Sequence, residues 1–331
     1  MKAHVMKRRT VLETLAAVPL LAASQRSWGQ SVFPDKPVRV VVPFAPGNTL
    51  DTALRQVAEV FKQNTGQALV VEAKPGGSGI IAAQSVMQAA PDGYTLLLAN
   101  TSMFTINPHT FAKLPYDPEK NFKPVTNFLG AALVMAVHAS VPANNVVEFV
   151  AWVKANPGKT SFASFTAGNS SHFAGVILNQ RAGLDMTHVP FNGTPPAVQN
   201  LVGGQVNAAF LPLLAVKPHV ESGKVKVIAI SSPQRSALAP NLATFREQGY
   251  PELDIYIWSS IAAPAGTPDA IISRLNTEFV KALRSSEIRD KWAAMAFEPM
   301  PTTPEETARF AQGESKRWAE AVKISGFKAA E

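Results

Sequence analysis

The residues best suited to binding chemistry lie where a short apolar run gives way to a helical pattern. Val38–Phe44 is typical of a buried strand, Pro46 and Gly47 indicate a loop, and Asp51 precedes a helix expected at 52–64. Such a loop leaves unpaired backbone amides at a helix N-terminus, where the helix dipole also favours an anion. The pattern therefore predicts an anion-binding loop; the alternative is an ordinary turn capped by Asp51.

The same construction recurs twice more along the chain. Gly76–Gly79 precedes a helix expected at 79–90, and Thr166–Ser171 precedes a helix expected at 172–181. Small and hydroxylated residues at these positions also leave backbone amides open to a ligand. Three such loops in one chain favour the binding interpretation over that of an isolated turn.

The N-terminus has the pattern of an export signal. The basic run Lys7–Arg9 precedes an apolar run at 11–23, and small residues allow cleavage after Gly29. We therefore expect segment 1–29 to be removed on export. The paired arginines partly resemble a twin-arginine signal, although Glu13 departs from that pattern, so both the Sec and the twin-arginine routes stay open. No later apolar run is long enough to span a bilayer.

Composition excludes several classes of function. Residues 31–331 hold 26 basic and 23 acidic side chains, scattered and without interleaved aromatics, so we expect no nucleic-acid surface. The small positive excess suits an anionic ligand. The chain has no cysteine, which excludes disulfides and thiolate catalysis. Its histidines lack metal-ligand spacing and no nucleotide fingerprint appears, so we expect neither a metal nor a nucleotide.

Short apolar runs alternate with helical patterns, which is typical of an α/β sheet with helices on both faces. In a first series we expect strands at 38–44, 68–73 and 95–100, with helices at 52–64 and 79–90. The apolar segment 124–138, broken by Gly130, is expected to carry the chain into a second domain.

A second series follows the same alternation. We expect helices at 146–155, 172–181, 196–201 and 215–222, and strands at 160–165, 187–191, 206–211 and 225–231. A strand at 253–263 then returns the chain, and helices at 269–284 and 304–324 are expected to close the first domain. The predicted fold is two α/β domains joined by two crossovers around a cleft: domain I at 30–128 and 253–331, and domain II at 129–252.

Several segments resemble a known family. PFAPGNTLD (43–51), EAKPGGSGIIAA (72–83), APDGYTLLLAN (90–100) and LDMTHVPFNGTPPAVQNLVGGQV (184–206) are similar to tripartite tricarboxylate transporter receptors, also called Bug-type extracytoplasmic solute receptors. The resemblance covers essentially all of the chain after the signal. It implies a periplasmic binding protein with a two-lobed, type II-like fold, which closes over a small carboxylate and delivers it to membrane subunits of a transporter. It also implies no cofactor and no catalysis, and we expect a monomer.

The resemblance further implies a map of the binding site. Two loops, 44–51 and 164–172, would grip the carboxylate with backbone amides, hydroxyls and ordered water. They lie, like the other candidates, at carboxyl ends of strands, where open α/β sheets bind ligands. We expect Asp51 to shape its loop, because its charge would repel a carboxylate. The candidate ligand-binding residues are Phe44, Ala45, Gly47, Asn48, Thr49, Leu50, Asp51, Ile80, Asn100, Thr101, Ser102, Ser164, Thr166, Ala167, Gly168, Asn169, Ser170, Ser171, His172, Phe191, Asn192, Gly193, Thr194 and Leu211.

The chain departs from the family at several of these positions. Leu50 replaces a frequent Thr, Ile80 an Asn, Phe191 a Tyr, Asn192 a Lys, and Leu211 an Asp. If these residues line the cleft, the ligand has an apolar body, because burying apolar surface contributes roughly 25 cal/mol per Å². An aromatic carboxylate such as terephthalate or benzoate would fit best, with a medium-chain dicarboxylate next. The alternative is that these residues only pack.

Two other functions stay open. The same fold can serve as a sensing receptor for a two-component system, which differs in its partner and not in its pocket. A periplasmic hydrolase using Ser170, Ser171 and His172 is a remote alternative, because no nucleophile elbow frames these serines. Trp258, on the expected return strand, is placed either at the cleft mouth or in packing near the hinge.

Overall fold

The computed structural model describes residues 33–237 and 239–328. The chain divides into two compact units, Met1–Asp35 and Lys36–Glu331, and the second contains every element discussed below. The predicted export signal, 1–29, lies outside the described residues. Among the helices that the structure describes, none combines the length and apolar character needed to cross a membrane.

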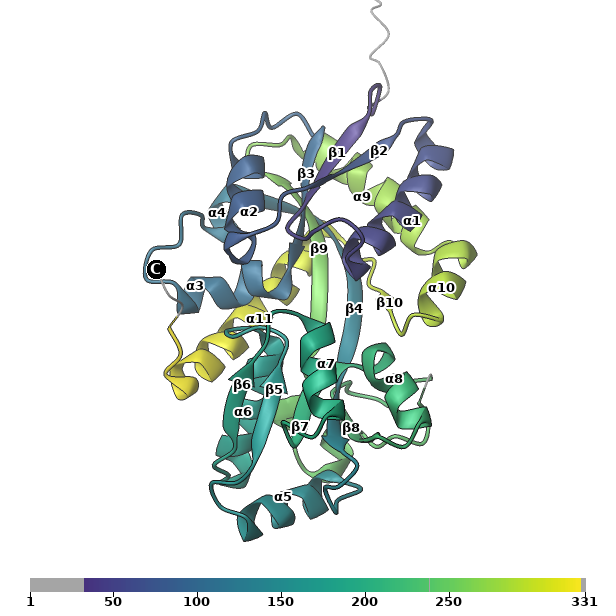
Figure 1. Ribbon diagram of the computed structural model, residues 1–331. Coiled ribbons are helices and arrows are strands. Elements are labelled where there is room, and N and C mark those ends of the chain that lie inside the picture. Colours follow the sequence, from purple (N-terminus) through teal and green to yellow (C-terminus); the bar gives the residue numbers. More distant parts are fainter. Residues whose placement is uncertain (1–32, 238, 329–331) are drawn as a thin grey trace, which may run out of the picture. The chain divides into compact units, whose positions relative to one another are not determined.

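The second unit alternates strands and helices (Figure 1). The strands are β1 (Val38–Val42), β2 (Leu69–Ala73), β3 (Thr95–Asn100), β4 (Phe122–His138), β5 (Ser161–Ser164), β6 (Thr187–Pro190), β7 (Ala208–Pro212), β8 (Val225–Ile230), β9 (Tyr256–Pro264) and β10 (Glu298–Pro299). The helices are α1 (Thr49–Thr65), α2 (Ile80–Met87), α3 (Asn107–Thr110), α4 (Pro118–Asn121), α5 (Val146–Ala155), α6 (Ser170–Ala182), α7 (Thr194–Val202), α8 (Leu213–Glu221), α9 (Asp269–Leu283), α10 (Ser286–Ala293) and α11 (Pro304–Ser325). Short helical turns are η1 (Gly77–Gly79), η2 (Ser102–Ile106), η3 (Arg246–Gln248) and η4 (Pro251–Leu253).

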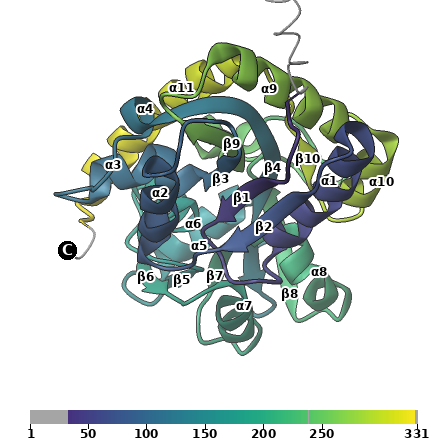
Figure 2. The same cartoon turned by 90° about the horizontal axis from the view of Figure 1, so that it is seen from above.

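The strands follow the order β2-β1-β3-β9-β4-β7-β5-β6, and β8 and β10 also pair with β4. In the first lobe, β1 is parallel to β2 and β3, while β9 runs antiparallel to β3 and β4. In the second lobe, β5 is parallel to β6 and β7, while β4 runs antiparallel to β7 and β8. Helices flank the strands on both sides, as the view from above shows (Figure 2). The two-lobed α/β fold is therefore confirmed.

One strand, β4, belongs to both lobes. Its residues 122–132 pair with β9, and its residues 133–138 pair with β7 and β8. The expected break at Gly130 is wrong, because the strand continues through it. A Cβ at Gly130 would lie 2.5 Å from Met300 Sδ and 2.9 Å from the Tyr256 ring. Only a glycine at this position leaves space for these two side chains.

Most predicted elements are confirmed to within a few residues, and α5 begins and ends where it was predicted. The prediction placed the start of α1 too late: the helix begins at Thr49, because the Asn48 side chain caps it by accepting a hydrogen bond from Leu50 N. Helix α10, which begins after the cap residue Ser285, was not predicted.

The C-terminal helix α11 contacts both lobes. Its first half places Phe310 against the core of the first lobe, where the ring meets Trp258 edge to face at 5.2 Å between centroids. Its second half inserts Trp318 and Val322 into the core of the second lobe, beside Phe173. The helix that was expected to close the first domain therefore packs against the second lobe as well. Trp258 is 1% exposed, so its packing interpretation is confirmed and the cleft-mouth alternative is excluded.

Candidate ligand-binding site

The candidate loops follow strands that run toward the middle of the second unit (Figure 1). Strand β1 descends to the middle from the top of the view, and β5 rises to it from below. The loops after β1, β3, β5 and β6 thus sit where the two lobes adjoin, at the carboxyl ends of their strands. This is the position at which open α/β sheets bind small molecules.

In the first loop, Asp51 organises the backbone. The Gly47 amide donates to Asp51 Oδ2 at 3.0 Å, and Arg55 donates from Nε at 3.0 Å and from Nη2 at 3.1 Å. The carboxylate is 1% exposed, and the hydrogen bond from Arg55 lowers its pKa. Asp51 therefore shapes the loop, as predicted, while the helix cap is Asn48 and not Asp51. Arg55 therefore balances the charge of Asp51 at this helix N-terminus.

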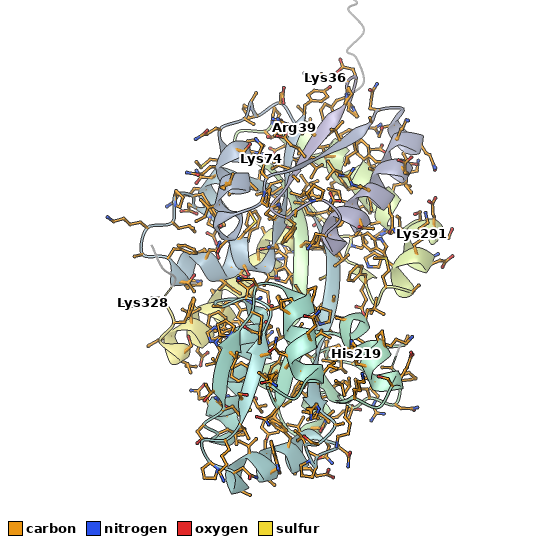
Figure 3. The ribbon with its side chains drawn as sticks, in the orientation of Figure 1. Lys36, Arg39, Lys74, His219, Lys291 and Lys328 are labelled. Atoms are coloured by element: carbon orange, nitrogen blue, oxygen red, sulfur yellow. The ribbon has the colours of Figure 1, made fainter. Side chains whose placement is uncertain are left out.

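The basic side chain nearest to the GGSG loop is also engaged. Lys74 Nζ lies 3.2 Å from Glu72 Oε1 and donates to Ser85 Oγ at 2.7 Å. Arg39 pairs with the other oxygen of Glu72 at 2.8 Å, and both cations lie in the first lobe (Figure 3). Lys74 is therefore engaged by Glu72 and Ser85 within the first lobe.

In the second loop, Asn169 caps α6. Its Oδ1 accepts from Ser171 N at 3.0 Å, from His172 N at 3.1 Å and from Ser171 Oγ at 2.8 Å. Ser171 Oγ also accepts from Phe165 N at 3.2 Å. These hydroxyl and amide side chains are buried, whereas Thr166 and Ala167 are exposed. The polar side chains of Asn169 and Ser171 therefore build the loop rather than face solvent.

Two histidines stack beneath this loop. The rings of His172 and His188 are 3.8 Å apart and inclined by 16°, with Phe173 and Phe162 stacked on their outer faces at 5.0 and 5.1 Å. Burial lowers the pKa of each histidine to about 4, so both are neutral at neutral pH. A neutral His172 can accept a hydrogen bond, and its Nδ1 takes one from the Gly168 amide at 3.2 Å.

These contacts disfavour the hydrolase alternative. His172 uses Nδ1 for the loop backbone, and Ser171 Oγ bonds to Asn169 and Phe165. At the start of this loop, Ser164 does contact a histidine, with its Oγ 2.7 Å from His188 Nε2. Its side chain has no solvent exposure, so no substrate reaches it.

The remaining loops place their residues differently. Thr101 is buried, with its hydroxyl bonded to the backbone of Trp258, and Asn100 Oδ1 accepts from Met103 N at 2.9 Å. After β6, Phe191 N donates to Ser164 O at 3.0 Å and Gly193 N to Phe165 O at 2.8 Å, which fixes this loop against β5. Phe191 itself is half-buried.

Leu211 lies in a core cluster against which Phe165 and Phe191 also pack. Its side chain is 0% exposed and packs in the second lobe's core with Val134, Ala163 and Val216. Leu211 therefore packs in the core of this structure, as its alternative interpretation states, and its contact with a ligand stays a prediction.

The structure sorts the predicted residues by exposure. The candidates with exposed or half-buried side chains or backbone are Phe44, Ala45, Gly47, Asn48, Leu50, Ile80, Asn100, Ser102, Thr166, Ala167, Gly168, Phe191, Asn192, Gly193 and Thr194. The buried candidates are Asp51, Thr101, Ser164, Asn169, Ser170, Ser171, His172 and Leu211. Thr49 contributes the first residue of α1.

Three residues beside the loops were not predicted. Phe165 follows β5 between two predicted positions and is half-buried, so its place in the loop could have been anticipated. His188 lies on β6, and Phe327 comes from the segment after α11. No local pattern indicated either of them, because their contacts depend on the folded chain.

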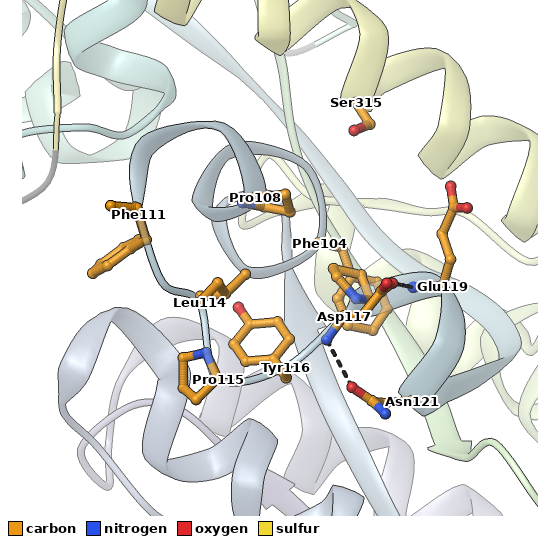
Figure 4. A pocket seen from close by; sticks show the side chains of 12 residues that line it. Phe104, Pro108, Phe111, Leu114, Pro115, Tyr116, Asp117, Glu119, Asn121 and Ser315 are labelled. Atoms are coloured by element: carbon orange, nitrogen blue, oxygen red, sulfur yellow. Dashed lines mark hydrogen bonds between the residues drawn. The ribbon is translucent and has the colours of Figure 1, made fainter.

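A separate hollow lies in the first lobe, between α11 and the segment 104–121. Its volume is about 700 Å³, and Phe104, Phe111, Leu114 and several prolines gather around it (Figure 4). Asp117 N donates to Asn121 Oδ1 at 2.7 Å at its rim. None of the candidate ligand-binding residues lines this hollow.

Comparison with known proteins agrees with the fold and the loops. A model of the tripartite tricarboxylate transporter family receptor matches residues 53–327. Protein BugT of Bordetella pertussis is 32% identical over 297 residues, which cover 89% of this chain and 91% of BugT. A protein of R. palustris solved with adipate superposes with a TM-score of 0.80 at 28% identity, covering 89% of this chain and 99% of that one. MatC from Rhodopseudomonas palustris, solved with bound malate, gives a TM-score of 0.75 at 32% identity, covering 88% and 100%. The chain therefore belongs to the family of tripartite tricarboxylate transporter receptors, which are solute-binding proteins and not enzymes.

Proposed function

We propose that this protein is a periplasmic receptor that captures a small organic carboxylate and presents it to the membrane subunits of a tripartite tricarboxylate-type transporter. One observation carries this proposal: two loops at carboxyl ends of strands hold backbone amides that the protein does not use. In the described part of the chain, the amides of Ala45, Ala167 and Asn169 donate to no other residue. Amides at helix starts are suited to an anion.

The relatives support a carboxylate as the ligand. One was solved with adipate and another with malate, and both match most of this chain. Acidic side chains near the loops do not oppose an anion, because Asp51 is paired with Arg55. Carboxylate binding by backbone amides thus needs no unpaired lysine or arginine.

We further propose that the ligand has an apolar body. Leu50 and Ile80 in the first lobe and Phe191 in the second are half-buried at the loops, and Phe165 adds an aromatic side chain beside them. Leu211 is fully buried in this structure, so the proposal depends on the other positions. An aromatic carboxylate such as terephthalate or benzoate is our first choice, and adipate is the second. The proposed site offers no free carboxylate to pair with an ammonium group, and an unpaired buried charge costs several kcal/mol.

Calorimetry with terephthalate, benzoate, adipate, malate, citrate and glutamate tests the proposal. We expect an aromatic acid or adipate to bind more tightly than citrate, and glutamate to bind poorly. Phe191→Asn should weaken the aromatic acids more than malate, with Asn192→Ala as the matched control on the same loop. Tight binding of citrate or glutamate without any response to aromatic acids would contradict the apolar body. A protein that binds no carboxylate would contradict the function itself.

A further inference from the structure

The residue that follows the C-terminal helix reaches the second candidate loop. Helix α11 ends at Ser325, its cap residue Gly326 has a φ of +64°, and the chain then places Phe327 against Gly168. The fit is close enough that a Cβ at Gly168 would lie 2.5 Å from Phe327 Cε1. The Phe327 ring also meets His172 edge to face, with 5.3 Å between centroids, and Phe173 at 6.0 Å.

Phe327 adds a side wall to the column of stacked rings beneath the loop. Phe162 from β5, His188 from β6 and His172 from α6 stack in sequence, and His172 is the member that bonds to the Gly168 amide. A ring that packs at a steep angle against His172 restricts the rotation of the imidazole and limits the access of water to it. The orientation of His172 Nδ1, and with it the Gly168 backbone, thus depends on Phe327.

We propose that Phe327 is a positioning residue for the carboxylate-binding loop, holding Gly168 and its unbonded neighbours Ala167 and Asn169 in the conformation that receives the ligand. Phe327 does not need to touch the ligand for this role. Helix α11 also packs in the core of the first lobe. The position of the second-lobe loop therefore depends, through this helix, on both lobes. The inference rests on the proposed function.

The test compares Phe327→Ala with Phe327→Tyr and with Ile324→Ala. Tyrosine keeps the ring. Ile324 lies in the last turn of α11, three residues before Phe327, and is 37% exposed, so Ile324→Ala removes an apolar side chain that does not build the loop. Phe327→Leu is a further variant that keeps bulk without an aromatic edge, in case the alanine variant does not fold. The full chain after export is used throughout.

Two measurements without ligand come first. Amide hydrogen exchange at Gly168 should accelerate by roughly 10-fold or more in Phe327→Ala, with the strands of both lobes unchanged. Proton NMR should show the His172 pKa rising from about 4 toward its ordinary value, because water then reaches the ring. Phe327→Tyr and Ile324→Ala should behave like the unsubstituted protein in both measurements. If Phe327 contributed only to global stability, neither the exchange rate at Gly168 nor the pKa of His172 would change in Phe327→Ala.

Calorimetry with adipate and terephthalate follows. Phe327→Ala should lower the affinity for whichever acid binds by roughly 2- to 30-fold, a range typical of residues that act without touching the ligand. Phe327→Tyr should bind that acid as tightly as the unsubstituted protein does. Unchanged Gly168 exchange, an unchanged His172 titration or unchanged affinity in Phe327→Ala would each overturn the inference. Failure of the unsubstituted protein to bind either acid, or any other carboxylate, would instead overturn the proposed function.

Discussion

Replacing Gly168 by alanine tests the proposed binding loop most directly. Gly168 has a φ of +72°, and an L-residue in that left-handed conformation costs about 1–2 kcal/mol. The new Cβ would also lie 2.5 Å from Cε1 and 2.7 Å from Cζ of Phe327, so the ring or the loop must move. Overpacking of this kind costs about 1–3 kcal/mol. The free energy of unfolding should therefore fall by about 2–5 kcal/mol in total.

Gly183 supplies a matched control at the other end of the same helix. It has a φ of +62°, and a Cβ added there would have no atom within 4 Å, so Gly183→Ala introduces backbone strain without a clash. The difference between the two variants in urea unfolding measures the contact with Phe327. In a protein that also carries Phe327→Ala, the cost of Gly168→Ala should fall to that of Gly183→Ala.

Binding separates the loop from general stability. A hydrogen bond from an amide to a charged group contributes about 1.5–3 kcal/mol, so losing one weakens binding roughly 10- to 150-fold. Calorimetry should show this loss for Gly168→Ala, no loss for Gly183→Ala, and a smaller loss for Lys74→Gln, because Lys74 is engaged by Glu72 and Ser85. A larger loss for Lys74→Gln, or equal behaviour of the two glycine variants, would refute binding by backbone amides.

Three further predictions concern the two lobes. Leu211→Ala should lower the free energy of unfolding by about 2–5 kcal/mol and leave the ranking of ligands unchanged, since the side chain is in the core. His172 and His188 have pKa values of about 4 in the folded state, below their ordinary value of 6.5, so their contribution to stability is complete above pH 6.5 and is lost as the pH falls toward 4. Urea unfolding between pH 7 and 4 should show this slope, reduced in His188→Phe. Small-angle scattering should show contraction on saturation with a ligand that calorimetry has identified, and an unchanged profile would contradict hinge closure.

The sequence predicted an element most accurately where contacts between residues close in the sequence determine it. Helix α5 begins after Asn145, whose side chain accepts from Glu148 N at 2.8 Å, and α11 begins with a capping box between Thr303 and Glu306. Such caps and their helical periodicity depend only on neighbouring residues. The continuity of β4 through Gly130 could not be predicted in this way, because it depends on Tyr256 and Met300, which are distant in the sequence.

The same distinction between local and long-range contacts explains which parts of the candidate site were predicted. The loops themselves were predicted, because glycines and cap residues at strand ends are local signals. The placement of Leu211 was left open between cleft and core, because β7 is covered on both faces: Phe210 packs into one core cluster and Leu211 into another. A strand buried on both sides shows no alternation from which the exposed face can be inferred. Phe327 was missed for a related reason, since only the course of α11 brings it to Gly168.

The arrangement of polar groups in the loops implies how selectivity arises. The side-chain oxygens of Asp51 and Asn169 accept hydrogen bonds from their own loops. The hydroxyls of Ser164 and Ser171 are hydrogen-bonded to other protein groups. What these loops offer a ligand is therefore mainly backbone, and an amide recognises any carboxylate with little regard for what it is attached to. Discrimination among carboxylates must then come from the side chains beside the amides. In this protein those side chains include Leu50, Ile80 and Phe191, and we therefore expect the ligand to be distinguished by its body and not by its charge.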